Sequence, residues 1–414
     1  MDVLVLGMHY PPEHTGNAPY TAGMVAALAA AGHRVRVVTG YPHYPQWVVH
    51  DGYEGLRHRE TDGGGVPITR VRHPVPREPS ALRRAVMDAT FTAHAASIGR
   101  QGARRPDVVI AISPVLLTVL AGLRWKRRGR TALGVVTQDL YSRALTETGI
   151  ASAGAGQAAA RLEGWLLSRA DGVAVVHEQF ADGLAALGVK RDRVTTIRNW
   201  SHVGTGATDR ATTRRALGWR DDEVIVLHAG NMGLKQGLEN VVDTARLADE
   251  TAAPVRFVLL GDGNQRAALE RHGAGVGRLE FRDPLPGDHF SDALAAADVL
   301  LVNEATTVAE MSVPSKLTSY FSAARPVVAA SWDRSAAAAE LRRSGGGVRV
   351  DPGRPQDLLD AVRRIAEDPA RAEALASAGR AYAQEHLGAA AAHRDYQRWV
   401  EGLAASRTHQ GEST

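Results

Sequence analysis

Val3-Leu-Val-Leu-Gly7, His9-Tyr-Pro-Pro-Glu-His-Thr-Gly-Asn17, Tyr20–Ala31 and Arg34-Val-Arg-Val-Val-Thr39 follow one another near the start of the chain. The first and last of these segments are short apolar runs, typical of buried strands. The third has apolar residues at helical spacing and stops at Gly32. The order strand, loop, helix, strand predicts a parallel sheet, because parallel neighbours need a crossover connection.

The same alternation recurs along the rest of the chain. It predicts further strands at 107–112, 131–137, 172–177 and 193–197, then at 224–229, 255–260, 279–282, 299–302, 326–330 and 347–350. A polar, Gly/Ser/Thr-rich stretch at 199–210 breaks the rhythm and is expected to be a linker. Residues 41–77 are expected to form long loops, and residues from about 355 to 404 to be helical throughout.

The pattern predicts an α/β protein with two doubly wound, Rossmann-like parallel-sheet domains facing across a deep cleft. The expected domains are 1–203 and 204–387, with a C-terminal helix at about 388–414 packing back on the first domain. In open α/β sheets, ligands bind outside the carboxyl ends of the strands. We therefore expect a ligand in the cleft between the two domains.

The composition is that of a folded globular protein. Of the 414 residues, 44% are hydrophobic and 23% charged, and the formal net charge is only +4. No apolar run approaches the ~20 residues that span a bilayer. The chain has no cysteine, which excludes disulfides and thiolate metal sites. The modest charge gives no indication of nucleic-acid binding.

Several common site motifs are absent from the sequence. Neither Gly16 nor Gly261-Asp262-Gly263 has the G-x-G-x-x-G spacing of a dinucleotide site, and no P-loop occurs. The sixteen His residues show no H-E-x-x-H spacing, and no Asp-x-Asp triplet occurs. A nicotinamide enzyme, a P-loop ATPase and a metal held by one of these motifs are therefore not expected.

The stretch Val313-Pro-Ser-Lys-Leu-Thr-Ser-Tyr-Phe-Ser-Ala-Ala-Arg-Pro-Val-Val-Ala-Ala330 predicts a polar turn, a short helix and a buried strand. Lys316 falls in the first turn of the helix, where a cation is unfavourable because the helix N-terminus already carries partial positive charge. A bound anion such as a diphosphate would explain this placement. A solvated surface lysine is the alternative interpretation.

Two further strand ends carry candidate site residues. His228-Ala-Gly-Asn-Met-Gly-Leu-Lys-Gln-Gly-Leu-Glu239 is a glycine-broken turn that offers Asn231, Lys235 and Gln236 as donors to an anion. Asp139, which follows a predicted strand, could orient an acceptor hydroxyl or stabilise positive charge on a sugar ring. An ordinary helix cap is the structural alternative for Asp139, as it is for the pair His177-Glu178.

These segments together resemble the retaining glycosyltransferases of family 4, which have the GT-B fold. The resemblance runs over nearly the whole chain and is closest to a branch acting in capsule, O-antigen and colanic acid assembly. Six motifs in the family's order carry it: His9-Tyr-Pro-Pro-Glu-His-Thr-Gly16, Gly32-His33-x-Val35, Ala170-Asp171-x-Val173-Ala-Val-Val-His-Glu178, Ile197-Arg-Asn199, Ala229-Gly-Asn-Met-Gly-x-x-Gln236-Gly-Leu-Glu239, and Pro314-Ser-Lys-Leu317 with Ala324-Arg-Pro-Val-Val328.

The resemblance implies a metal-independent enzyme with no cofactor. It would move a sugar from a nucleotide-diphosphate sugar, UDP-sugar favoured, to a hydroxyl of a glycan, glycolipid or natural product. The first domain would take the acceptor, and the second domain would take most of the donor. Asp139 and Lys316 are the expected catalytic residues. The expected donor-binding residues are Gly16, Gly230, Asn231, Gly233, Lys235, Gln236, Gly261, Asp262, Arg282, Glu304, Pro314, Ser315, Leu317 and Ser319.

The chain departs from the family's pattern at several of these places. Asn231 and Gln236 stand where many members carry Arg and Lys, so Lys316, and then Lys235, are the candidates to supply the missing charge. Many members also carry two Glu residues around the last motif, where this chain has Met311 and Ser319. Glu310 is one position out of register, and Glu304 is an alternative carboxylate for the sugar.

Two other functions stay open at this point. A sugar-nucleotide epimerase shares the two-domain architecture, although only Asp139 and Glu304 could be assigned at the sugar. A non-catalytic nucleotide-sugar binding protein is the second alternative. The N-terminal residues contain no basic leader, so the expected location is cytoplasmic. The Arg-rich clusters leave open a peripheral contact with the inner membrane face.

Overall fold

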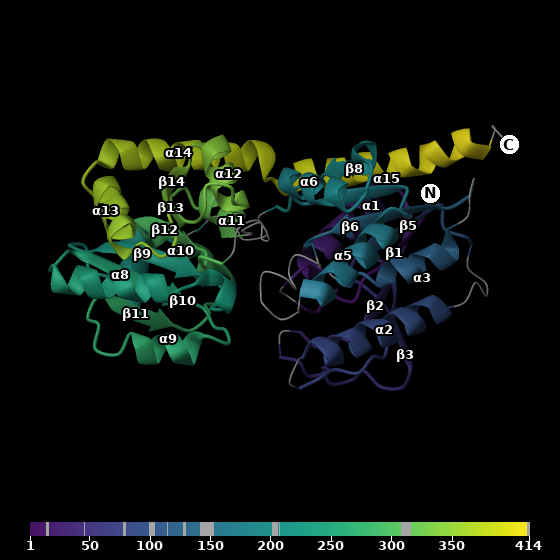
Figure 1. Cartoon of the computed structure of the whole chain (residues 1–414), viewed down its shortest axis with the longest axis horizontal. Helices are drawn as coiled ribbons and strands as arrows, with labels where there is room; N and C mark the ends of the chain where they lie inside the picture. Colours follow the sequence, from purple (N-terminus) through teal and green to yellow (C-terminus); the bar gives the residue numbers. More distant parts are fainter. Residues whose placement is uncertain are drawn as a thin grey trace. The chain divides into compact units, whose positions relative to one another are not determined.

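The structure of the chain is a computed structural model that describes residues 1–13, 16–44, 46–77, 80–98, 104–113, 115–126, 130–140, 153–200, 206, 208–307 and 316–411. The chain divides into two compact units. Unit 1 consists of Met1–Asn199 and Ala389–Thr414, and unit 2 consists of Trp200–Gly388. In Figure 1, unit 1 runs from purple to teal and includes the yellow C-terminal helix, whereas unit 2 is mostly green.

Unit 1 is built on an eight-stranded sheet with the order β3-β4-β2-β1-β5-β6-β7-β8. All neighbouring strands are parallel except β3 and β4. The central strands are buried at every position, as expected where helices cover both faces of a parallel sheet. The strands are β1 (Asp2–Leu6), β2 (Arg34–Gly40), β3 (Arg57–Thr61), β4 (Pro67–Val71), β5 (Val108–Ile112), β6 (Ala132–Thr137), β7 (Gly172–Val175) and β8 (Val194–Thr196).

The C-terminal helix packs on the sheet of unit 1 because two strands carry glycine beneath it. A Cβ on Gly134 of β6 would lie 2.6 Å from the Trp399 ring, and one on Gly172 of β7 would lie 2.9 Å from Leu403. The described helices of unit 1 are α1 (Ala18–Ala30), α2 (Ala81–Ser97), α3 (Thr118–Trp125), α5 (Ala153–Leu167), α6 (Glu178–Ala186), the 3-10 turn η1 (Arg191–Arg193) and α15 (Ala389–Gly411).

Unit 2 contains a six-stranded, wholly parallel sheet with the order β11-β10-β9-β12-β13-β14. The side chains of β12 alternate between two apolar layers: Leu300 and Val302 pack on one face, Val299 and Leu301 on the other. The strands are β9 (Val224–Ala229), β10 (Val255–Leu260), β11 (Leu279–Arg282), β12 (Val299–Asn303), β13 (Val327–Ala330) and β14 (Gly347–Val350).

Helices cover both faces of this second sheet. Residues of α10, α11, α12 and α14 belong to one apolar layer, and residues of α8, α9 and α13 belong to the other. The described helices are α7 (Arg210–Leu217), η2 (Leu234–Gln236), α8 (Glu239–Glu250), α9 (Arg266–His272), α10 (Gly287–Ala296), α11 (Lys316–Ser322), α12 (Ala336–Ser344), α13 (Pro355–Ala366) and α14 (Pro369–His386).

Each sheet has a topological switch point beside its first strand. In unit 1, β1 lies between β2 and β5, and in unit 2, β9 lies between β10 and β12. The loops that follow β1 and β9 therefore leave the sheet where its strand order reverses. This is the usual place for a ligand in an open α/β sheet.

The predicted fold class, two doubly wound parallel sheets, is confirmed. The predicted strands at 224–229, 255–260, 279–282 and 347–350 coincide with β9, β10, β11 and β14. The predicted boundary between residues 203 and 204 lies outside the described residues, so the domain limits stay predictions.

The prediction of long loops at 41–77 was wrong in part. The segment contains the antiparallel pair β3 and β4, joined through Asp62-Gly-Gly-Gly65. Strand β3 is the edge strand of its sheet and is mainly polar on both faces, so it lacks the apolar alternation that indicates a strand. The helix α2 was not predicted either.

Within the described residues, no helix has the length and hydropathy that crossing a membrane requires.

Candidate functional site

In unit 2, the loops after β9 and β10 touch each other backbone to backbone. A Cβ on Gly261 would lie only 2.0 Å from the carbonyl oxygen of Gly230, and one on Gly263 would lie 2.4 Å from that of Met232. The Met232 N–H donates to the carbonyl of Asp262 across the same gap (2.8 Å). Glycine is therefore required at 261 and 263, since any side chain would separate the loops.

Lys316 reaches this pair of loops from the start of α11. A Cβ on Gly230, whose φ is +125°, would lie 3.1 Å from Lys316 Cε and 3.5 Å from Nζ. Burial lowers the pKa of Lys316 to about 8, and the nearby Glu304 carboxylate opposes this shift. Burial makes the positive charge of Lys316 costly. An anion bound beside Nζ would offset that cost and would itself be stabilised by the charge. The structure thus brings Lys316 and Gly230, two of the predicted donor-site residues, together.

The turn after β9 is held together by its own polar groups. The Gln236 side-chain oxygen accepts from the Gly233 N–H (3.0 Å), and the Lys235 carbonyl accepts from the Ala305 N–H (2.9 Å). The Asn231 side chain is exposed, whereas Lys235 and Gln236 are half-buried. Asn231 thus remains a candidate ligand contact, and Gln236 stabilises the turn.

Three other residues predicted to bind the sugar donor differ in burial and in their contacts within unit 2. Glu304 is buried directly after β12. The Arg282 guanidinium contacts Glu280 and the carbonyl of Leu217, so its bonds support the fold. Asp262 is exposed and caps the N–H of Gly263 (2.7 Å).

Two predicted residues besides Lys316 lie on α11, and others fall before it. Leu317 belongs to the apolar core, so a ligand could meet only its backbone, whereas Ser319 is half-buried. The other residues considered on this stretch, namely Glu310, Met311, Pro314 and Ser315, lie outside the described residues. The polar turn predicted before this helix falls there as well.

Three buried polar residues support the loop after β9 and were not singled out from the sequence. Asn303 donates to the carbonyls of Gln236 (2.7 Å) and Gly237 (2.8 Å), and it accepts from Asn240 (2.8 Å). The Tyr320 hydroxyl accepts from the Ala229 N–H (2.9 Å). An Asn at the end of an otherwise apolar strand is the signal that could have identified Asn303.

In unit 1, the predicted residues are more scattered. Asp139 is half-buried and lies two positions beyond β6, beside Gln138, whose side chain accepts from Asn199 (2.8 Å). Gly16 lies in the loop after β1 with φ +65°, and among the described residues a Cβ there would meet only the Tyr44 ring (3.9 Å).

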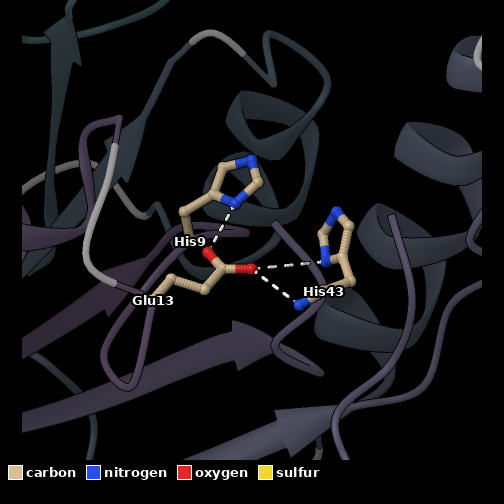
Figure 2. Close-up of side chains that lie close together, drawn as sticks. All are labelled: His9, Glu13 and His43. Atoms are coloured by element: carbon tan, nitrogen blue, oxygen red, sulfur yellow. Dashed lines mark hydrogen bonds and ion pairs between the residues drawn. The ribbon is translucent and has the colours of Figure 1, made fainter. Parts of the chain in front are cut away.

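The loop after β1 also carries a cluster that sequence reasoning missed (Figure 2). His9 Nδ1 lies 2.7 Å from one oxygen of Glu13. The other oxygen of Glu13 accepts from the backbone N–H groups of His43 (2.8 Å) and Tyr44 (2.9 Å). The motif around residues 9–16 was noticed in the sequence, but a contact between residues 13 and 43 could not be read from spacing.

The electrostatics of this cluster follow from burial and hydrogen bonding. Burial raises the pKa of Glu13, but the bonds from His9 and the two backbone amides outweigh it, so the net shift is downward. Burial lowers the pKa of His43, and that of His73 to about 4. Burial also raises the pKa of Asp88, on α2, to about 7. Glu13 is thus an anion, and the lowered pKa values of His43 and His73 favour their neutral forms.

His9, Glu13 and His43 lie close enough together to be considered as metal ligands. The donor set, two imidazoles and one carboxylate, is one that Zn²⁺ accepts. However, both oxygens of Glu13 already accept hydrogen bonds, and His43 Nδ1 faces the Tyr41 carbonyl (3.0 Å). A metal would have to displace these bonds, so the arrangement fits a hydrogen-bonded cluster better than a metal centre.

Two protein-family profiles match the chain. Residues 15–200 match the glycosyl transferase 4-like domain, and residues 223–368 match the glycosyl transferases group 1. The WcaI protein of Escherichia coli K12, a glycosyl transferase ascribed to colanic acid biosynthesis, is 33% identical over 333 residues, which are 77% of this chain and 80% of WcaI. The 2-deoxystreptamine glucosyltransferase of Streptomyces kanamyceticus is 27% identical over 55% of this chain and 59% of that enzyme.

Solved structures share the fold over almost the whole chain. The sucrose-phosphate synthase of Thermosynechococcus elongatus has a TM-score of 0.72 at 20% identity and covers 98% of this chain and 99% of its own. HepE of Anabaena, solved in complex with UDP, has a TM-score of 0.69 at 17% identity and covers 98% of this chain and 100% of its own. At these identities the likeness shows the fold, which is GT-B.

Proposed function

The chain belongs to the glycosyltransferase group 1 family, and from this premise we propose that it is a retaining, metal-independent enzyme that uses a nucleotide-diphosphate sugar. The observation that carries the proposal is Lys316 Nζ beside Gly230, at the switch point of the unit 2 sheet. A cation and a bare backbone are together suited to a diphosphate. The proposed role of unit 2 is therefore donor binding, and that of unit 1 is acceptor binding.

The proposed reaction needs no covalent enzyme intermediate. The acceptor oxygen forms a bond to the anomeric carbon on the face from which the diphosphate departs. The bond from that carbon to the phosphate oxygen breaks, its electron pair leaves with the diphosphate, and a phosphate oxygen takes the acceptor proton. Lys316 would stabilise the charge that develops on the diphosphate, because a fixed cation there needs little reorganisation.

Other residues have supporting roles in this proposal. Glu304, which is buried near Lys316, is proposed to contact the sugar. Asp139 is proposed to stabilise positive charge on the sugar ring or to orient the acceptor. Backbone and side-chain contacts to the donor are proposed for Gly16, Gly230, Asn231, Gly233, Lys235, Gln236, Gly261, Asp262, Arg282, Pro314, Ser315, Leu317 and Ser319.

A UDP-sugar is the favoured donor, and a carbohydrate hydroxyl is the favoured acceptor. The support for the donor is that the structural neighbour HepE was solved with UDP and with UDP-glucose. The support for the acceptor is that the relatives WcaI and 2-deoxystreptamine glucosyltransferase are named for a glycan and an aminocyclitol. Glycolipid acceptors belong to the same proposal, and peripheral contact with a membrane would accompany them.

A donor and acceptor panel tests the proposal. The donors are UDP-glucose, UDP-N-acetylglucosamine, GDP-mannose and dTDP-glucose, and the acceptors are D-glucose, octyl β-D-glucoside and 2-deoxystreptamine. Nucleotide release reports transfer or hydrolysis, and proton NMR of the product reports its anomeric configuration. An α-linked product from an α-linked donor is expected. A β-linked product would contradict retention, and interconversion of the donor sugars without nucleotide release would indicate an epimerase.

Metal independence is tested in the same assay. The proposal assigns the balancing positive charge to Lys316, so EDTA should leave the rate of nucleotide release unchanged. Loss of activity in EDTA that Mg²⁺ or Mn²⁺ restores would show that a metal supplies this charge instead.

A further inference from the structure

The loop after β1 in unit 1 holds a carboxylate–imidazole pair that the proposed reaction leaves without a role. His9 Nδ1 and Glu13 Oε2 are 2.7 Å apart. An ionised carboxylate can only accept, so Nδ1 must carry the proton that joins them. A neutral imidazole has one ring proton, and Nε2 of His9 is then a hydrogen-bond acceptor.

Glu13 is fixed in place from a second loop, the one that follows β2. Its side chain is 1% exposed, and Oε1 accepts from the N–H groups of His43 (2.8 Å) and Tyr44 (2.9 Å). With one oxygen bound to two backbone amides, the carboxylate cannot rotate away from His9 without breaking those bonds. Glu13 therefore selects both the orientation and the tautomer of the His9 ring.

Of the two histidines beside Glu13, only His9 is placed to meet a ligand. Its Nε2 lies on the edge of the ring away from Glu13 (Figure 2), and the side chain keeps 18% of its surface exposed. No hydrogen bond joins this nitrogen to any residue that the structure describes. His43 is fully buried, and its Nδ1 is directed at the Tyr41 carbonyl (3.0 Å).

The surroundings of His9 suit a carbohydrate. The Tyr44 ring stands edge-on to His9 at 5.7 Å, and the Trp47 ring follows at 6.1 Å from Tyr44. The Arg84 guanidinium lies over Trp47 (4.9 Å) and holds that ring in place. Asp88 lies close enough to interact electrostatically with His9. A polar acceptor atom beside aromatic rings can take a hydroxyl on one side and the C–H face of a sugar on the other.

We propose that Nε2 of His9 accepts a hydrogen bond from a hydroxyl of the carbohydrate acceptor, and that Glu13 is the positioning residue that fixes the required tautomer. The inference rests on the proposed function, since it names the acceptor contact of that same reaction. No covalent change occurs at His9, because the acceptor proton goes to the departing phosphate as described above.

The substitution Glu13→Gln tests the tautomer without removing the cluster. The Gln oxygen can keep both backbone bonds, which turns its NH₂ group toward His9. Two donors would then face each other, so His9 should move its proton to Nε2 and lose the acceptor atom. Long-range ¹H–¹⁵N NMR of the ring nitrogens should show Nδ1–H in the unchanged protein and Nε2–H in the variant. Nε2–H in the unchanged protein would overturn the proposal.

Kinetics test the role of that tautomer. In Glu13→Gln, the acceptor KM found with the panel above should rise about tenfold, the size expected for one lost hydrogen bond. The dissociation constant for UDP should not change. Asp243→Asn is the matched control, because Asp243 faces His272 (2.8 Å) in an exposed carboxylate–imidazole pair of unit 2. It should alter neither constant.

Four outcomes separate the competing explanations. An active enzyme whose acceptor KM is the same in Glu13→Gln would defeat this inference alone, as would a loss of activity that only follows a loss of folded protein. A chain that releases no nucleotide from any donor would defeat the proposed function, and this inference with it. Calorimetric binding of Zn²⁺ at micromolar concentration, abolished in Glu13→Gln, would reassign the cluster to a metal.

Discussion

The loops after β1 and β9 occupy the same topological position in their two units but carry opposite chemistry. The loop after β9 is rich in glycine and lies beside Lys316, so it offers N–H groups and a cation. The loop after β1 carries the anion Glu13 with His9, and its neighbours include aromatic rings. A switch point provides only a place at the sheet edge, and the side chains decide what it can bind.

The two loops also differ in what holds them. After β9, backbone touches backbone at Gly230 and Gly261, and no side chain could be added there. After β1, a buried side chain, Glu13, joins the loop to residues 43 and 44. We infer that the unit 2 loop is sensitive to added volume, whereas the unit 1 loop is sensitive to a change of charge or of hydrogen bonding.

The largest effect is expected from Gly261→Ala. The added Cβ would lie 2.0 Å from the Gly230 carbonyl oxygen, and the residue has φ +141°. We expect unit 2 to lose about 3 kcal/mol of unfolding free energy, at the upper end for overpacking, and UDP binding to be lost. Urea unfolding and calorimetry measure the two effects. Gly275→Ala is the control, since its φ is also positive (+82°) but no atom of the described residues lies within 4 Å of the new Cβ. Equal losses in both variants would contradict the contact argument.

Lys316→Ala should have the next largest effect. Removing a charged contact to the diphosphate costs about 1.5–3 kcal/mol, which weakens UDP binding by about 10- to 150-fold. Isothermal titration calorimetry with UDP measures it. Lys190→Ala, at an exposed lysine of unit 1, should leave the affinity unchanged. An unchanged affinity in Lys316→Ala would remove this residue from the donor site and with it the contrast between the two loops.

Asp139→Asn should separate turnover from donor binding. The substitution keeps the size of the side chain and removes its charge, so transfer should slow by about tenfold, or about 1.4 kcal/mol in the barrier. The affinity for UDP should stay the same, because UDP lacks the transferred sugar ring and the acceptor that Asp139 is proposed to contact. Turnover near that of the unchanged enzyme would assign Asp139 a purely structural role.

How much of the fold and of the candidate site could be predicted from the sequence depends on how far apart in the chain the interacting residues lie. Strand ends at Ala229, Leu260 and Arg282 were predicted correctly, because buried parallel strands are continuous apolar runs bounded by glycine and polar residues. Lys316 was selected from a local rule that it breaks, a cation in the first turn of a helix, and its role at a diphosphate stays a prediction.

The missed features depend on contacts between residues far apart in the chain. Glu13 accepts from residues 43 and 44, and Asn303 donates to residues 236 and 237. Glu13 and Asn303 each join two loops, and the order of the strands in the sheet decides which loops become neighbours. That order cannot be read from a single sequence. The edge strand β3 was missed for a different reason. It carries polar residues on both faces, so it lacks the alternation of apolar and polar residues that indicates a strand.

The smallest expected effect is a pH dependence that distinguishes the two loops. Burial lowers the pKa of Lys316 in the folded protein from 10.5 to about 8, so below pH 8 the side chain is mostly charged, and above pH 8 it loses its proton. UDP needs the charged form, and its affinity should therefore be about fivefold weaker at pH 9 than at pH 8. Calorimetry at pH 7, 8 and 9 measures this, and the dependence should vanish in Lys316→Ala. The same depressed pKa means that the unfolded chain binds more protons, so the stability of unit 2 should rise with pH between about 8 and 10.5. A UDP affinity that is flat from pH 7 to 9 would show that Lys316 stays charged throughout, as a lysine exposed to water would.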